Sequence, residues 1–382
     1  MFMTKNDRVK VAIIRCETYD EKEVYNAVKK GIDLIGGIDL FVKPHEKILL
    51  KVNCLAGSKP DDAVTTHPSI LNAVIKILHG AHGKNLSLSY GDSPGFGKPA
   101  LSLEQSGFKD VAEKHNVKLG DFTEGKTKEF PQGLETKSFN IANACLESDG
   151  IISLSKMKTH MLAKITGAVK NQFGCVYGLN KANFHLKIPN PTNFSKMLVD
   201  LNMLLKPRLF IMDGIVAMEG NGPRGGTPIN MNCIIISTDP IAVDSTFCRM
   251  IDLDPLTVPT IKYGKLAGLG TYLEEEIEYV GDPIESFINK KFDVERKPVS
   301  NDLLKSFMPR FIRNSIYHKP VIDPKKCIKC GICVEACPVE GKALHFVDNK
   351  RTAPPKYDYN KCIRCYCCQE MCPQKAISSK GR

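Results

Sequence analysis

Apolar segments alternate with amphipathic segments through the first half of the chain. Short apolar runs predict buried strands at 9–16, 46–53, 86–90 and 117–121. Apolar residues at helical spacing predict helices at 21–35, from Thr66-His67-Pro68-Ser69 onward, and at 102–115. This alternation of strand and helix is typical of a parallel sheet covered by helices.

The same pattern continues after short polar strands between 123 and 140. Further strands are predicted at 150–155, 208–213 and 231–237. Helices are predicted at 161–173, at 194–206 and from Asp239-Pro240, where aspartate suits the N-cap and proline the first turn. We therefore expect residues 1–270 to form an α/β domain with a doubly wound, largely parallel sheet.

The pattern becomes irregular after residue 270. Proline and lysine accumulate between 271 and 320, which predicts a linker or peripheral segment with a helix at 301–313. Residues 321–382 have a different composition, because nine of the 15 cysteines lie there. We predict that they form a separate, small α+β domain.

These cysteines follow one spacing that occurs twice. Each copy reads C-x2-C-x2-C-x3-C-P, first at 327–338 and again at 362–373. In this spacing, three thiolates of one copy bind one [4Fe–4S] cluster and the fourth binds the other cluster. The predicted ligands of the two [4Fe–4S] clusters are Cys327, Cys330, Cys333 and Cys372 for one, and Cys362, Cys365, Cys368 and Cys337 for the other.

Two other uses of the cysteines are less consistent with the spacing. Zinc sites more often pair C-x2-C units across longer loops. A disulfide framework suits short secreted chains, and the N-terminus shows no apolar signal region. Cys367 exceeds the eight expected ligands, and it is either a small packed residue or an alternative ligand.

The cysteine segment resembles a bacterial-type two-cluster ferredoxin domain over roughly residues 320–378. The resemblance includes both prolines, the lysine before each copy and Lys375-Ala376-Ile377 near the end. It implies transfer of single low-potential electrons. We expect a cytoplasmic protein, since the chain has no apolar run of the roughly eighteen residues that a membrane helix needs.

The net charge of +11 is concentrated at the C-terminus. Residues 319–382 contain 13 Lys and Arg against 6 Asp and Glu. Two oxidised clusters with their thiolates would offset about four of these charges. This balance favours an acidic redox partner protein over nucleic acid, because aromatic residues are not interleaved with the basic ones.

Polar residues follow several predicted strands of the α/β domain directly. They are Asn53, Asp92, the segment Lys156-Met-Lys158-Thr-His160, and Asp213. In doubly wound sheets, ligands bind outside the carboxyl ends of the strands. We therefore expect these side chains, together with Lys158 and the nearby Glu219, to surround one crevice.

Lys170 and Asn171 lie in the segment Thr166–Gly174, which is rich in small residues. One interpretation is a pocket for a carboxylate or phosphate, with Lys156, His160 and Lys170 as catalytic groups. The other is a solvated, basic start of a helix. The segment Gly220–Gly226 formally matches G-x-G-x-x-G, but Pro223 and the following strand favour a glycine-rich loop over a nucleotide fingerprint.

Seven phrases, in order, resemble the family called domain of unknown function 362. They are Thr66-His67-Pro68, Gly91-Asp92-Ser93-Pro94-Gly95, Lys156–His160, Thr166–Asn171, Asp213-Gly214, Glu219–Pro223 and Ser237–Asp244. The likeness covers roughly residues 45–270. It implies a ferredoxin segment at the C-terminus, as many similar proteins have, and it brings no reaction with it.

Two functions agree with these features. The first is an iron–sulfur oxidoreductase that exchanges electrons with an anionic small molecule bound in the α/β domain. The second is a non-catalytic electron carrier or subunit that docks onto a partner redox enzyme.

Overall fold

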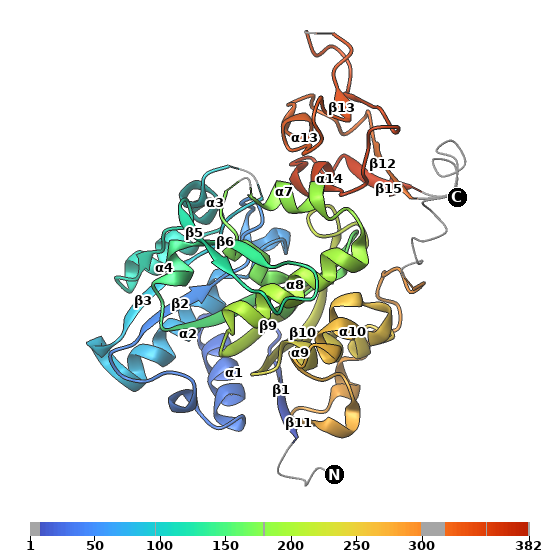
Figure 1. Ribbon diagram of the computed structural model, residues 1–382. Coiled ribbons are helices and arrows are strands. Elements are labelled where there is room, and N and C mark those ends of the chain that lie inside the picture. The colour runs from blue at the N-terminus through green and yellow to red at the C-terminus, as the bar shows by residue number, and fades with distance from the viewer. Residues whose placement is uncertain (1–7, 96, 179, 299–317, 349, 381–382) are drawn as a thin grey trace.

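The computed structural model describes residues 8–95, 97–178, 180–298, 318–348 and 350–380. Helices cover a large central sheet, and a smaller C-terminal unit lies against the α/β unit near α7 (Asn180–Lys187) (Figure 1). No helix among the described residues is long and apolar enough to cross a membrane.

The central sheet is mixed but largely parallel, as the sequence predicts. Its strands, in spatial order, are β11 (Ile277–Gly281), β1 (Val9–Arg15), β10 (Thr227–Ser237), β9 (Leu209–Glu219), β7 (Gly150–His160), β2 (Lys47–Lys51), β3 (Ser87–Gly91) and β4 (Lys118–Leu119). Pairing is parallel from β9 to β4 and between β1 and β11, whereas β10 runs antiparallel to both of its neighbours. The carboxyl ends of β2, β3, β7 and β9 therefore meet at one edge.

Helices pack on both faces of this sheet. One face is covered by α1 (Glu21–Leu34), α2 (Pro68–His82), α3 (Pro99–Gln105) and α4 (Phe108–Lys114). The other is covered by α5 (Asn143–Leu146), α6 (Ala168–Asn171), α8 (Pro191–Leu205), α9 (Pro240–Met250) and α10 (Pro259–Leu266). Successive residues of a strand point to opposite faces, so Val11 joins one core and Ala12 the other.

The Asp239-Pro240 signal does begin a helix. The Asp239 carboxylate accepts hydrogen bonds from the backbone N–H groups of Ile241 and Ala242, at 2.7 and 2.9 Å. It therefore satisfies two of the free donors at the start of α9.

The predicted helix at 161–173 is wrong. Strand β7 continues to His160 and turns into β8 (Lys164–Thr166), which pairs with it in an antiparallel hairpin. Helical structure is confined to the short α6, followed by a tighter turn. The predicted helix at 102–115 is two helices, because Gly107 has a φ of 74° and breaks the chain direction between α3 and α4.

Part of the segment predicted as a linker belongs to the α/β unit. Strand β11 forms the edge of the central sheet, and Phe287 and Phe292 are buried in its core. The predicted helix at 301–313 lies outside the described residues. A separate hairpin of β5 (Gly125–Glu129) and β6 (Ser138–Ala142) corresponds to the expected polar strands.

The C-terminal unit contains two short antiparallel strand pairs and two short helices. These are β12 (Lys319–Ile322) with β15 (Ile377–Lys380), β13 (Leu344–His345) with β14 (Lys356–Tyr357), α13 (Ile332–Glu335) and α14 (Cys367–Met371). Each helix follows a residue with positive φ, Gly331 before α13 and Tyr366 before α14. The repeat in the sequence is thus visible in the local structure.

Candidate functional site

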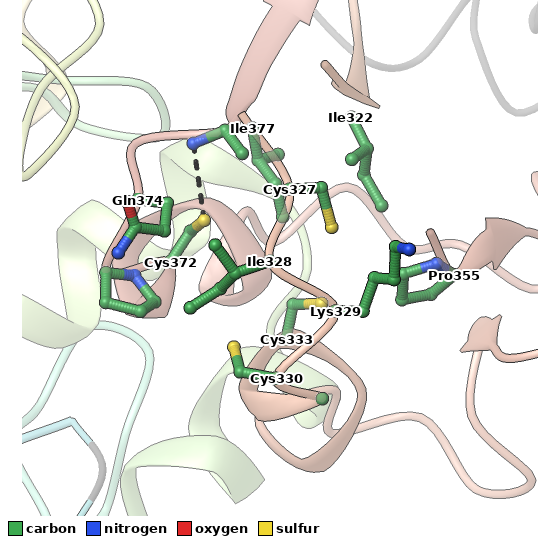
Figure 2. Close-up of a pocket in the computed structure, with 13 residues that line it drawn as sticks. Ile322, Cys327, Ile328, Lys329, Cys330, Cys333, Pro355, Cys372, Gln374 and Ile377 are labelled. Atoms are coloured by element: carbon green, nitrogen blue, oxygen red, sulfur yellow. Dashed lines mark hydrogen bonds between the residues drawn. The ribbon is translucent and has the colours of Figure 1, made fainter. Parts of the chain in front are cut away.

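The first four predicted cluster ligands line one small cavity in the C-terminal unit. Figure 2 shows the side chains of Cys327, Cys330 and Cys333 together with Cys372, which comes from the second copy of the repeat. Apolar side chains, including Ile322 and Ile377, complete the lining.

The other four predicted ligands line a second cavity. Cys362, Cys365 and Cys368 share it with Cys337 from the first copy. Each cavity thus combines three cysteines of one copy with the fourth of the other.

The residues around both cavities fit a [4Fe–4S] cluster. Backbone N–H groups point at two of the sulfur atoms: that of Ala343 lies 3.4 Å from Cys337 Sγ, and that of Ala376 lies 3.3 Å from Cys372 Sγ. Such N–H donors and an apolar shell stabilise cluster thiolates. Within the described ranges, no three His, Cys, Asp or Glu side chains converge as a single metal ion would require.

A polar pocket lies between the α/β unit and the C-terminal unit. Its cavity has a volume of about 90 Å³. The α/β unit contributes side chains from the carboxyl ends of the strands and from α7, and α14 contributes the opposite wall. The polar and ionisable lining residues are Asn53, Asp92, Ser93, Lys170, Asn171, Lys181, His185, Cys367 and Glu370.

Lys170 is the candidate anion-binding group of this pocket. It is half-buried at the end of α6, and its Nζ lies 5.9 Å from the centre of the Phe173 ring. Its ammonium makes no hydrogen bond or ion pair with any residue that the structure describes. A cation left without a partner in a cavity is suited to a carboxylate or phosphate ligand.

The neighbouring Asn171 and Asp92 are fixed by Lys51. The Lys51 ammonium lies 2.8 Å from Asp92 Oδ1, and both side chains are almost fully buried. The Asn171 amide donates to the Lys51 carbonyl at 3.2 Å. Gly174 is required here, because a Cβ at that position would lie 1.8 Å from Asp92 Oδ1. Lys51 was not among the predicted site residues, since a lysine inside an apolar strand gives no local signal.

Lys158 lies behind the pocket wall and holds Asn53. Its ammonium donates to Asn53 Oδ1 at 2.8 Å and also to the Val64 carbonyl. Burial, together with the nearby Lys170 and Lys156, lowers the pKa of Lys158 to about 7. Lys158 would therefore act on a ligand in the pocket through Asn53 and not by direct contact.

His160 connects the α/β unit to the C-terminal unit. Its Nδ1 accepts hydrogen bonds from the N–H groups of Leu162 and Ala163, at 3.0 and 3.2 Å, so the ring proton is on Nε2. That Nε2 lies 2.9 Å from Glu370 Oε1 on α14. Burial, assisted by Lys170, lowers the pKa of His160 to about 4, so the ring is neutral at pH 7. Burial alone would raise the pKa of Glu370, but His160 and Lys170 hold it at about 2.

Lys156 and Asp213 form a separate, internal network. Lys156 Nζ lies 2.8 Å from Asp213 Oδ2 and 2.7 Å from the Tyr19 hydroxyl, and the Lys156 and Asp213 side chains are fully buried. The Tyr19 ring stacks on His67 at 3.7 Å. Glu219 is also apart from the pocket, because it accepts the N–H of Asp293 at 2.8 Å. The structure therefore does not bring Lys156, Asp213 and Glu219 into the pocket lining with Lys170.

Two lining residues of α7 were missed at the sequence level. Lys181 donates to the carbonyls of Ser93 and Val176, at 3.0 and 2.9 Å, and burial lowers its pKa to about 7. His185 is 5% exposed and stacks on Phe194, and its Nδ1 has no hydrogen-bond partner among the described residues. Their spacing of four, which places both on one face of a helix, was the available signal.

The glycine-rich loop after β9 joins the two units. The Gln369 amide donates to the Asn221 carbonyl at 2.7 Å, and the Asn221 amide donates to the Ile377 carbonyl at 2.9 Å. Arg224 donates to the carbonyls of Gly57 and Met371, at 3.1 and 3.4 Å. The loop thus contacts both α14 and the first residue of β15.

A model of the domain of unknown function DUF362 matches residues 48–249. The chain belongs to the DUF362 family. A model of a 4Fe-4S dicluster domain matches residues 315–376, which supports iron–sulfur electron transfer in this DUF362 protein. The chain is 31% identical over 313 residues to the thylakoid-associated protein sll1697 of Synechocystis sp., a match that covers 81% of this chain and 94% of the relative.

Two solved structures are also similar to this DUF362 chain. One is the lactate racemase apoprotein from Thermoanaerobacterium thermosaccharolyticum, with a TM-score of 0.43, 10% identity, and coverage of 65% of this chain and 59% of that one. The other is a Thermotoga maritima protein, with a TM-score of 0.37, 12% identity, and coverage of 67% and 61%. The match spans less than two thirds of either structure.

Proposed function

We propose that this protein exchanges single, low-potential electrons with an anionic small molecule bound in the pocket between its two units. A [4Fe–4S] cluster, when bound, takes up and releases one electron at a time. The proposed holders of two such clusters are the two sets of four cysteines that line the cavities of the C-terminal unit.

The observation that carries this proposal is the shared wall of the pocket. Cys367 and Glu370 of α14 line the same cavity as Lys170 and Asn53 of the α/β unit. Cys367 directly precedes the predicted ligand Cys368 in the sequence. A molecule bound beside Lys170 would therefore lie against the backbone segment that carries cluster ligands.

The residues of the chain would have distinct tasks in this reaction. Lys170 would bind the anionic group, and Asn53, held by Lys158, would orient it. The Glu370 carboxylate faces His160 and attracts Lys170 only through space, so the hydrogen-bond donors of the Lys170 ammonium stay available for the ligand. Phe173 and Met371 would exclude water on the apolar side of the cavity.

The proposal is tested on protein purified without oxygen. Iron and sulfide analysis and electron paramagnetic resonance after dithionite reduction should report two [4Fe–4S] clusters. Calorimetric titration with acetate, pyruvate, succinate and inorganic phosphate should then identify at least one ligand. Lys170→Ala should weaken its binding by at least about tenfold, which corresponds to the loss of one charge-assisted contact.

A matched control is Lys187→Ala, at the exposed end of α7, which should leave binding unchanged. Equal binding by wild type and Lys170→Ala would remove Lys170 from the proposal. Absence of binding by all four anions, with intact clusters, would favour the second candidate function. That function is an electron carrier that docks onto a partner redox enzyme, and the exposed position of Cys330 is the observation that favours it.

A further inference from the structure

The two copies of the cysteine repeat differ in exposure. Cys330, the second cysteine of the first copy, is exposed, whereas its counterpart Cys365 is buried. Ile328 is 60% exposed, whereas its counterpart Ile363 is partly buried. The first cysteine set is therefore the one that a partner can approach closely.

The residue that follows the second cysteine explains part of this difference. It is Gly331 in the first copy and Tyr366 in the second, and both have positive φ. The Tyr366 ring is buried and lines the second cavity, and its hydroxyl donates to the His318 carbonyl at 3.0 Å. Gly331 has no side chain to cover Cys330 in the same way.

The surroundings of Cys330 are basic with an apolar centre. Arg351 is exposed, and its guanidinium donates to the Cys330 carbonyl at 2.9 Å. Lys329 lines the first cavity together with Ile328 (Figure 2), and Lys326 is exposed just before Cys327. We call this set the Cys330 face; its members are Lys326, Ile328, Lys329, Cys330 and Arg351.

We propose that the Cys330 face is the docking surface for a small, acidic one-electron carrier protein. This inference rests on the proposed electron transfer and adds the partner. In the encounter the carrier loses one electron and the iron–sulfur unit gains it, or the reverse, and no covalent bond forms. Basic charges around a small apolar centre suit a weak, transient complex, in which opposite charge accelerates association.

The repeat supplies a matched control for this proposal. Lys326 and Lys361 occupy the same position in the two copies, and their backbone N–H groups donate to the carbonyls of Asp323 and Asp358, at 3.3 and 3.2 Å. Both side chains are exposed. Charge reversal at Lys326 alters the Cys330 face, whereas charge reversal at Lys361 makes the same change beside the second cysteine set.

The experiment measures electron transfer from a reduced, acidic [2Fe–2S] ferredoxin by stopped-flow absorbance. For the wild type, the second-order rate constant should fall steeply between low and moderate salt. Lys326→Glu should lower it at least about threefold at low salt and flatten the salt dependence. Lys361→Glu should change it less than twofold.

Two measurements separate the failure of this inference from the failure of electron transfer itself. Dithionite reduction and the iron content should be the same in the wild type, in Lys326→Glu and in Lys361→Glu. A normal response to dithionite, with rates from the ferredoxin that are insensitive to salt or equally reduced by both charge reversals, would overturn the docking surface alone. Loss of the dithionite response in the wild type would instead overturn the proposed function.

Discussion

Replacement of Lys156 by methionine tests whether this lysine is structural or catalytic. The Lys156 and Asp213 side chains are fully buried, and their charged atoms lie 2.8 Å apart. Methionine fills a similar volume but removes the ammonium. The change would leave the Asp213 carboxylate in the interior without its positive partner.

The expected loss of folding free energy depends on the donors that still surround Asp213 after Lys156 is replaced. At an effective dielectric constant of about 20, opposite charges at this distance attract by about 6 kcal/mol. The loss of hydration on burying both ions offsets part of this attraction. Three donors to Asp213 would persist: the Tyr19 hydroxyl at 2.9 Å, the His67 N–H at 2.9 Å and the Ile215 N–H at 3.3 Å. We therefore expect a loss near the lower end for a broken buried pair, about 3 kcal/mol.

The assay is thermal unfolding followed by circular dichroism. A loss of about 3 kcal/mol corresponds to a Tm lower by about 6–12 °C in a unit of this size. The double variant Lys156→Met with Asp213→Asn should be less destabilised than the sum of the two single variants, because it leaves no unpaired charge. Lys170→Met, which breaks no hydrogen bond or ion pair among the described residues, should keep Tm within about 2 °C.

The opposite pattern would refute this assignment. If Lys156→Met unfolded at the wild-type temperature and no longer bound the anion, Lys156 would belong to the binding site after all. The internal network would then have to open in solution.

Three further outcomes are expected. Lys181 has a pKa of about 7 in the folded protein and about 10.4 in the unfolded chain. Between these values the unfolded state binds more protons, so the free energy of unfolding should rise as the pH increases above about 7. Urea unfolding between about pH 7 and 8.5 should show a shallower rise of this free energy for Lys181→Met. Gly174→Ala should lower the free energy of unfolding by at least about 3 kcal/mol, because the new methyl group would lie 1.8 Å from a buried carboxylate oxygen. Gly80→Ala, on the open face of α2, should not lower it in the same measurement. Cys372→Ser should lower the iron content by about half and Cys367→Ser should leave it unchanged, since Cys367 lines the pocket and not a cluster cavity; equal iron loss in both variants would refute this distinction.

The sequence predicted the elements whose signals are local. Apolar runs located β1, β2 and β3, and the Asp239-Pro240 pair located the start of α9. The β7–β8 hairpin was missed because its lysines are polar in the sequence but buried in the fold. Lys158 and Lys164 are satisfied by carbonyl groups of distant segments, and no periodicity within the hairpin reports those partners.

The same reason limits what could be predicted of the site. The cysteine spacing placed all eight predicted ligands in two groups, since each copy brings its thiols together within a few residues. The pocket depends on contacts between residues far apart in the chain. His160 meets Glu370 across the junction of the two units, and Lys156 meets Asp213 on the adjacent strand β9, so the sequence could not tell which lysine remained free for a ligand.

The arrangement of these lysines itself supports an anion in the pocket. Lys51 is paired with Asp92 and Lys156 with Asp213, and the Lys158 ammonium donates to two oxygen atoms. Burial of such groups is tolerated because each has a partner. Lys170 lies among them without a hydrogen-bond acceptor, because the Glu370 carboxylate of the opposite wall faces His160. An anionic ligand would supply the acceptor that the fold leaves open to the Lys170 ammonium.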